Sequence, residues 1–118
     1  MSKRGDKEFL ADIKAAIERI NSYVDDITYD EFLQKPMTQD AVIRNLEVIG
    51  EAIKNLTPAL RKKHNEVLWK ELAGLRDKII HFYFGIKWSI VWSVIKEKLP
   101  ELEEKVLKKW ENANNKKF

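Results

Sequence analysis

The chain has 118 residues, 44% of them hydrophobic and 35% charged, and a formal net charge of +3. This length suits one domain with a single core, and the composition excludes a disordered chain. The lack of cysteine excludes disulfides and thiolate metal sites and, with a polar N-terminus, predicts a cytoplasmic protein. No stretch approaches the roughly 20 apolar residues of a membrane span, so we expect no membrane partner. The mildly basic charge permits a nucleic-acid partner without demanding one.

Two long helices are predicted in the first half of the chain. The first runs from about Asp6 to Asp25, and the second runs from an N-cap at Thr38 to about Leu56. Between them, residues 28–33 read as a turn with one short helical turn, which Pro36 ends. Each long helix carries one apolar stripe, formed by Leu10, Ile13, Ile17, Ile20, Val24 and Ile27 in the first and by Val42, Leu46, Ile49, Ile53 and Leu56 in the second.

The second half predicts shorter helices around one unusual segment. Thr57-Pro58 starts a short helix to about Lys63, and His64 follows in a polar connection that we place at the surface. A third long helix begins near Leu68 or Trp69 and runs through residues 74–84, a fourth covers about 88–98, and Pro100 starts a last amphipathic helix. These elements predict an all-α, up-and-down bundle of about five helices over residues 1–111, with a polar C-terminal tail over 112–118.

The third long helix carries the most informative residues. On a helical wheel Arg76 and Tyr83 fall within a broad apolar arc, where a charged side chain is rare unless it is paired or faces a cleft. His81 is rotated from Arg76 by about 140° and displaced by roughly 7.5 Å along the axis, and Asp77 lies within i,i+4 reach of it. A strict helix therefore cannot aim Arg76 and His81 of one chain at one small target. Either the helix unwinds before His81, or two chains face each other about a two-fold axis.

Structural roles for the same residues remain open. Arg76 can pair with an acid such as Glu47 or Glu51, a single histidine near a helix end is commonly structural, and Tyr83 can pack in the core. Other site chemistries fit poorly, because there is no glycine-rich phosphate loop, no cluster of metal ligands and no Ser or Cys beside a base. An arginine suits a phosphodiester and a histidine suits general acid–base work. Metal-free RNA cleavage is thus chemically possible, and we expect no metal and no cofactor.

Three residues and their flanks resemble the HepT-like branch of the HEPN-domain ribonucleases. The motif of that branch is an arginine, four residues, a histidine, one residue and a tyrosine, which here are Arg76, His81 and Tyr83. Asp77 supplies the polar residue that the family favours after the arginine. The similarity continues through residues 38–52, 69–76, 81–85, 90–92 and 99–102, and residues 64–68 depart from it by lacking the family's proline-containing turn.

The resemblance implies a function and partners. HepT-like proteins are helical, homodimeric, metal-independent ribonucleases that serve as toxins of type VII-like toxin–antitoxin pairs, with the motif arginine and histidine in the dimer cleft. An MntA-type minimal nucleotidyltransferase neutralises them by transferring AMP from ATP to the motif tyrosine. Arg76 and His81 would then be catalytic and Tyr83 modified, with supporting roles open for Asp77, Asn45 and Glu51. The alternative is a non-catalytic helical module that binds a nucleotide or the nucleotidyltransferase.

Overall fold

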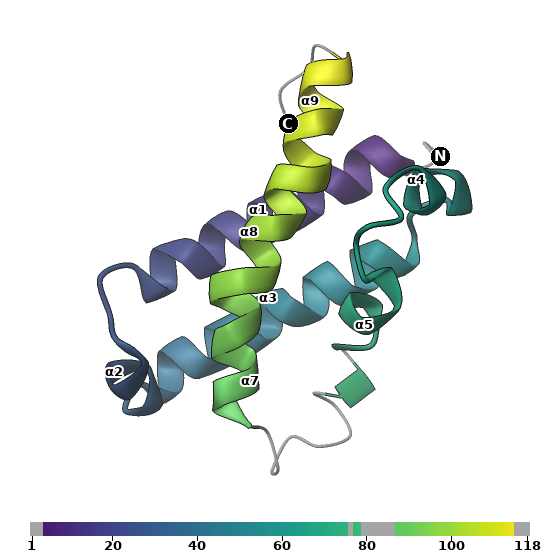
Figure 1. The fold of residues 1–118 in the computed structure, drawn as a ribbon. Helices are drawn as coiled ribbons and strands as arrows, with labels where there is room; N and C mark the ends of the chain where they lie inside the picture. Colours follow the sequence, from purple (N-terminus) through teal and green to yellow (C-terminus); the bar gives the residue numbers. More distant parts are fainter. Residues whose placement is uncertain (1–3, 76, 79–86, 115–118) are drawn as a thin grey trace.

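A computed structural model describes residues 4–75, 77–78 and 87–114, and all regular secondary structure in these ranges is helical. Helices α1 (Asp6–Val24) and α3 (Pro36–Lys54) lie side by side and antiparallel, joined through the short α2 (Tyr29–Leu33) (Figure 1). Helices α4 (Pro58–Lys63) and α5 (Trp69–Ala73) follow beside the C-terminal part of α3 (Figure 1). The predicted all-α fold is confirmed.

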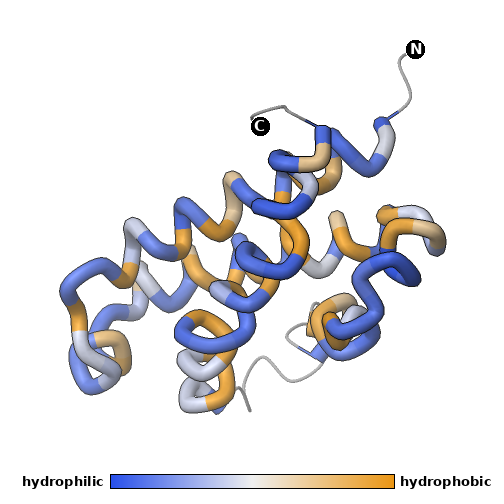
Figure 2. Tube along the Cα trace, turned by 45° about the horizontal axis from the view of Figure 1, so that its top comes forward, coloured by the Kyte–Doolittle hydropathy of each residue, from blue (hydrophilic) through white to orange (hydrophobic). Residues whose placement is uncertain are grey.

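The core forms where the predicted apolar stripes meet. Every stripe residue of the first two long helices is buried except Ile27, which packs against the core from its edge. In Figure 2 the apolar residues of the tube turn toward neighbouring helices, and the hydrophilic residues turn outward. A period of 3.6 residues puts residues three and four apart on one face, so each helix can bury a single side.

Helix starts are set by local hydrogen bonds. At α2 the Thr28 hydroxyl accepts from the Glu31 N–H at 3.1 Å, and the Glu31 carboxylate accepts from the Thr28 N–H at 3.0 Å, which is a capping box. The predicted N-cap at Thr38 is wrong, because α3 already begins at Pro36. A proline at the first helical position has no N–H to leave unpaired, and its fixed φ suits a helix.

The C-terminal part of the chain is one continuous helix that crosses α1 and α3 (Figure 1). It consists of α7 (Trp88–Ser93), η2 (Val94–Lys98), α8 (Leu99–Leu102), η3 (Glu103–Leu107) and α9 (Lys108–Asn114), where η2 and η3 are π-helical. The predicted break at Pro100 is therefore wrong. The wider π turn before Pro100, in which the Leu99 N–H bonds to the Val94 carbonyl, makes room for a ring that would clash in a regular α-helix.

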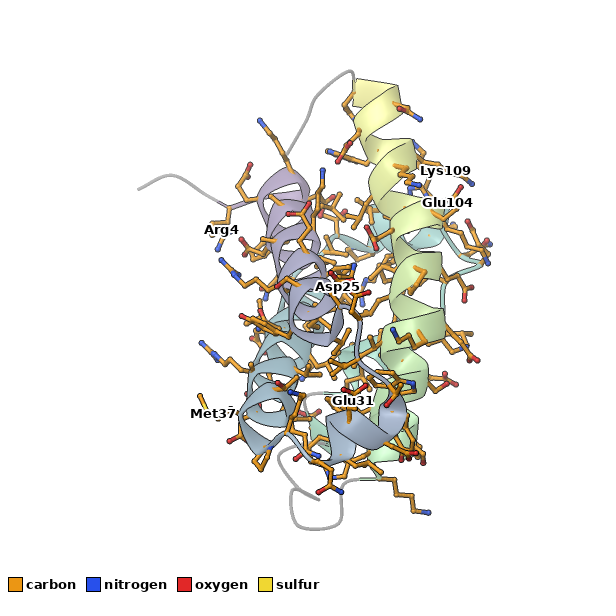
Figure 3. All side chains as sticks on the ribbon, turned by 90° about the vertical axis from the view of Figure 1, so that its left-hand side faces the viewer. Arg4, Asp25, Glu31, Met37, Glu104 and Lys109 are labelled. Atoms are coloured by element: carbon orange, nitrogen blue, oxygen red, sulfur yellow. The ribbon has the colours of Figure 1, made fainter. Side chains whose placement is uncertain are left out.

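The continuous helix holds the short elements in place. Phe32 of α2 is fully buried, with its ring centroid 5.7 Å from that of Trp88 and 5.1 Å from that of Trp92. Figure 3 shows Glu104 and Lys109 on this helix, at the right of the view, and Met37 at the opposite edge of the molecule. No helix within the described ranges has the length and apolar character needed to cross a membrane.

His64 is buried, and its prediction as a surface residue is wrong. Only 7% of its surface is exposed, because the connection that follows α4 packs near Lys105 and Lys109 of the C-terminal helix. Burial lowers the pKa of the His64 imidazole, and the charges of Lys63 and Lys109 act in the same direction, against Glu66 and a hydrogen bond to the backbone of Lys105. The histidine therefore belongs to the joint between α4, α5 and the C-terminal helix.

Candidate functional site

The predicted catalytic pair and the predicted modified tyrosine lie outside the described residues. Arg76, His81 and Tyr83 fall at position 76 and within residues 79–86, so their roles remain predictions. The structure does describe what enters and leaves this part of the chain: α5 with Leu75, Asp77 and Lys78 on one side, and α7 on the other. These flanking elements and the neighbouring face of α3 define the surroundings of the site.

Gly74 ends α5 just before the motif. Its N–H bonds to the Lys70 carbonyl at 3.0 Å, and its own carbonyl accepts the Lys78 N–H at 3.0 Å, so helical bonding resumes after one turn residue. A Cβ at this position would lie 3.3 Å from the Lys70 carbonyl oxygen, which is a tight contact. The predicted third long helix is therefore interrupted at Gly74, although Gly74 itself keeps right-handed helical dihedrals (φ −72°, ψ −11°). The predicted continuation through residues 79–86 lies outside the described residues.

Asp77 connects the motif segment to the end of α3. Its carboxylate oxygens lie 3.3 and 3.4 Å from the Lys54 Nζ, and its side chain is 56% exposed. A pair this exposed is screened by water and contributes between zero and about 1 kcal/mol. Lys54 was not predicted as part of the site, because no pattern in a single sequence links residues 23 positions apart.

Asn45 and Glu51 lie on different sides of α3. Asn45 is buried, and its Nδ2 donates to the Ala41 carbonyl one turn back at 2.9 Å. Glu51 is exposed and precedes Lys54 by three residues, which puts it on the face that meets Asp77. The structure therefore leaves Glu51 on the surface, where it lines a hollow with residues of α1, and turns Asn45 into the core. The supporting roles of both residues remain predictions.

The exposed face of α3 carries charges of both signs. Arg44, Glu47 and Glu51 line a shallow hollow between α1 and α3, together with Arg4 and Asp12. The Arg4 guanidinium pairs with Asp12 at 2.7 Å and lies 5.0 Å from the centre of the Phe9 ring. Within residues 4–75, 77–78 and 87–114 no group of three or more His, Asp or Glu side chains could hold a metal ion. The described residues around the motif segment thus supply cations, carboxylates and one buried amide.

Comparisons of the sequence with known proteins point to one family. The model of the "Ribonuclease HepT-like" family matches residues 13–108. The "Putative RNase MJ0127" of Methanocaldococcus jannaschii is 47% identical over 108 residues, which are 88% of this chain and 89% of that protein. The "Probable ribonuclease HepT" of Thermococcus cleftensis is 45% identical over 87% of this chain and 94% of its own. The "Putative RNase TTE0752" of Caldanaerobacter subterraneus is 43% identical over 85% and 86% of the two chains. No solved structure matches.

Proposed function

Because the chain belongs to the ribonuclease HepT-like family, and is thus an RNA nuclease, we propose that it cleaves RNA without a metal ion through Arg76 and His81. The observation that carries the proposal is the family match over residues 13–108, which includes the whole arginine–histidine–tyrosine motif. An arginine and a histidine together can supply the charge stabilisation and the proton transfer of a metal-free phosphodiester cleavage.

In the proposed reaction the 2′-hydroxyl of the RNA attacks the adjacent phosphorus. The His81 imidazole accepts the hydroxyl proton as the new P–O bond forms, and the 5′-oxygen of the next nucleotide leaves and takes a proton from water. The Arg76 guanidinium stabilises the negative charge that develops on the phosphoryl oxygens. The products are a 2′,3′-cyclic phosphate and a free 5′-hydroxyl, and no oxidant or cofactor is consumed.

The test is cleavage of RNA by the purified protein in the presence of EDTA. We expect the wild type to cut and the His81→Ala variant to lose at least about 100-fold in rate, the low end of what a general acid–base group contributes. Circular dichroism would show that the variant is folded. Equal cleavage by both proteins would remove His81 from the mechanism. An intact substrate with the wild type would favour the alternative, a module that binds a nucleotide or nucleotidyltransferase without cutting RNA.

We further propose that the site is built from two chains of a homodimer. The support is an apolar groove between α5 and the C-terminal helix, lined by Leu68, Leu72, Leu75 and Ile90 beside the motif segment. Leu68 is 53% exposed and Ile90 is 57% exposed, although both are large apolar residues. A second copy placed near this groove would cover them and bring the motif of one chain close to that of its partner.

Mixing two inactive variants tests the composite site. Arg76→Ala and His81→Ala homodimers would each be inactive. In a mixed dimer, one of the two composite sites would receive its arginine and its histidine from undamaged chains. Random mixing makes half of the dimers mixed, so we expect about a quarter of wild-type activity to return. A mixture that stays inactive while dimers exchange would show that each site uses a single chain.

We propose that the protein is the toxin of a toxin–antitoxin pair and that Tyr83 is its point of control. The phenolic oxygen would attack the α-phosphorus of ATP, releasing pyrophosphate and a proton and leaving AMP on the tyrosine. The added phosphate would put a negative charge two residues from His81. Intact-mass measurement after incubation with ATP and an MntA-type nucleotidyltransferase tests this, because the mass increase should be absent in Tyr83→Phe. An increase that persists in this variant would place the modification elsewhere.

A further inference from the structure

Helices α4 and α5 carry a basic surface next to the motif segment. We define it as Arg61, Lys62 and Lys70, which surround a shallow hollow also lined by Pro58, Asn65, Trp69 and Ala73. Among the described residues, no carboxylate contributes to this hollow. Its cations come from two separate helices, so tertiary packing and not sequence order alone brings them together.

The cations of the basic surface have no acidic partners within the described ranges. Some other lysines do: Lys54 pairs with Asp77, Lys105 with Glu101, Lys108 with Glu104 and Lys109 with Glu66. Glu66 is the one acid between Lys62 and Lys70 in the sequence, and it turns towards Lys109 of the C-terminal helix. The basic surface therefore keeps its full positive charge for a ligand.

Helix capping does not account for these cations. Lysine and arginine often occupy the last turn of a helix, where they bond the free carbonyls. Here the Trp69 indole N–H does so, donating to the carbonyls of Arg61 at 3.1 Å and His64 at 3.0 Å. The same two bonds hold α5 against the end of α4. These bonds fix the relative position of the two helices that carry the basic surface.

We propose that the basic surface binds the sugar–phosphate backbone of the RNA that the protein cleaves. This rests on the proposed nuclease function and adds the place where the strand lies outside the reacting bond. Arg76 lies six positions after Lys70, so the covalent chain limits the distance between their Cα atoms to about 20 Å. A single strand carries a phosphate roughly every 3.4 Å of helical rise, so a strand held at the reacting bond reaches Lys70 within about six nucleotides.

The chemistry favours a flexible polyanion. Arg61 can contact two phosphate oxygens, and Lys62 and Lys70 act as mobile point charges. Because none of them forms an ion pair with an acid among the described residues, they attract a phosphate chain whatever its base sequence. Their contribution is therefore affinity and strand path, and the choice of cleavage position falls to residues that touch the reacting bond.

Binding of an RNA that cannot be cut tests the proposal separately from catalysis. A fluorescent single-stranded RNA with 2′-O-methyl groups lacks the attacking hydroxyl, so its anisotropy reports binding alone. The variant is Lys62→Gln with Lys70→Gln, two exposed positions. The matched control is Lys7→Gln with Lys35→Gln, which removes the same charge from exposed positions on other parts of the chain.

Two lost phosphate contacts should reduce the slope of log affinity against log salt by about 1.4, and weaken binding roughly 25-fold at 0.1 M salt. The control should stay within about twofold of the wild type. Equal weakening of RNA binding in both variants, or no RNA binding by the wild type, would overturn the proposal that the basic surface binds RNA. Cleavage of unmodified RNA is measured in parallel. A wild type that binds through the basic surface but cuts nothing would overturn the nuclease mechanism and leave this inference standing.

Discussion

Replacing Trp69 by phenylalanine tests the joint that supports the basic surface and α5. The indole N–H is shared between the Arg61 carbonyl at 3.1 Å and the His64 carbonyl at 3.0 Å. Phenylalanine keeps an aromatic ring and removes this donor. The His64 carbonyl retains a bond from the Val67 N–H at 3.2 Å, so the penalty is that of about one buried acceptor, roughly 1–2 kcal/mol.

Trp110→Phe is the matched control. The Trp110 indole N–H is buried and has no hydrogen-bond partner among the described residues, so the same substitution there removes ring atoms but no bond. We expect Trp69→Phe to lower the free energy of unfolding by about 1–2 kcal/mol more than Trp110→Phe. For a domain near this size that difference corresponds to about 5–10 °C in Tm.

The assay is thermal and urea unfolding followed by far-UV circular dichroism at one protein concentration. Urea midpoints with unchanged slopes would assign the losses to stability and not to a change in the unfolded chain. Tm values for the two variants that agree within about 2 °C would refute the reasoning, because the indole hydrogen bonds would then contribute nothing measurable.

Three further outcomes follow from the described contacts. Burial lowers the pKa of His64 below its ordinary 6.5, so at low pH the imidazole binds a proton more readily in the unfolded chain than in the folded chain. The free energy of unfolding should therefore fall as the pH drops below about 6.5. In His64→Gln this part of the pH dependence of the urea midpoint should disappear, while the other histidine is present in both proteins. The double-mutant cycle of Lys54→Met and Asp77→Asn should give a coupling below about 1 kcal/mol, and a larger value would mean that Asp77 is more shielded than its exposure indicates. Thr28→Ala should cost about 1 kcal/mol in urea unfolding, because it removes the side-chain bond that starts α2, and an unchanged midpoint would contradict the capping box.

Local signals in the sequence predicted much of the fold. The stripe from Leu10 to Val24 identified a buried face because apolar spacing and helical period are the same property. Thr57-Pro58 marked the start of α4 correctly, and its Thr57 N–H and hydroxyl both donate to the Asp6 carboxylate, at 2.8 and 2.7 Å. Local rules also failed where packing decided the outcome: Pro100 lies inside a continuous helix because a π turn accommodates its ring.

The sequence also predicted only part of the candidate site. The motif residue types and their spacing came from sequence, and so did the family resemblance that the comparisons confirmed. The contact of Lys54 with Asp77 and the burial of Asn45 were not predictable in this way, because each depends on how α3 meets a distant segment. The break at Gly74 was also missed, since a glycine inside an apolar helical pattern is tolerated as often as it ends a helix.

By itself, the sequence determined that this protein is all-α, which faces of α1 and α3 are buried, and that it carries the Arg76–His81–Tyr83 motif of a ribonuclease family. These properties are encoded in residue types and short spacings, which chain order preserves. The tertiary structure decided that His64 is buried, that Asp77 meets Lys54, and that Arg61, Lys62 and Lys70 form one basic surface. Such contacts join segments whose separation along the chain carries no periodic signal, so only the packing of the helices brings them about.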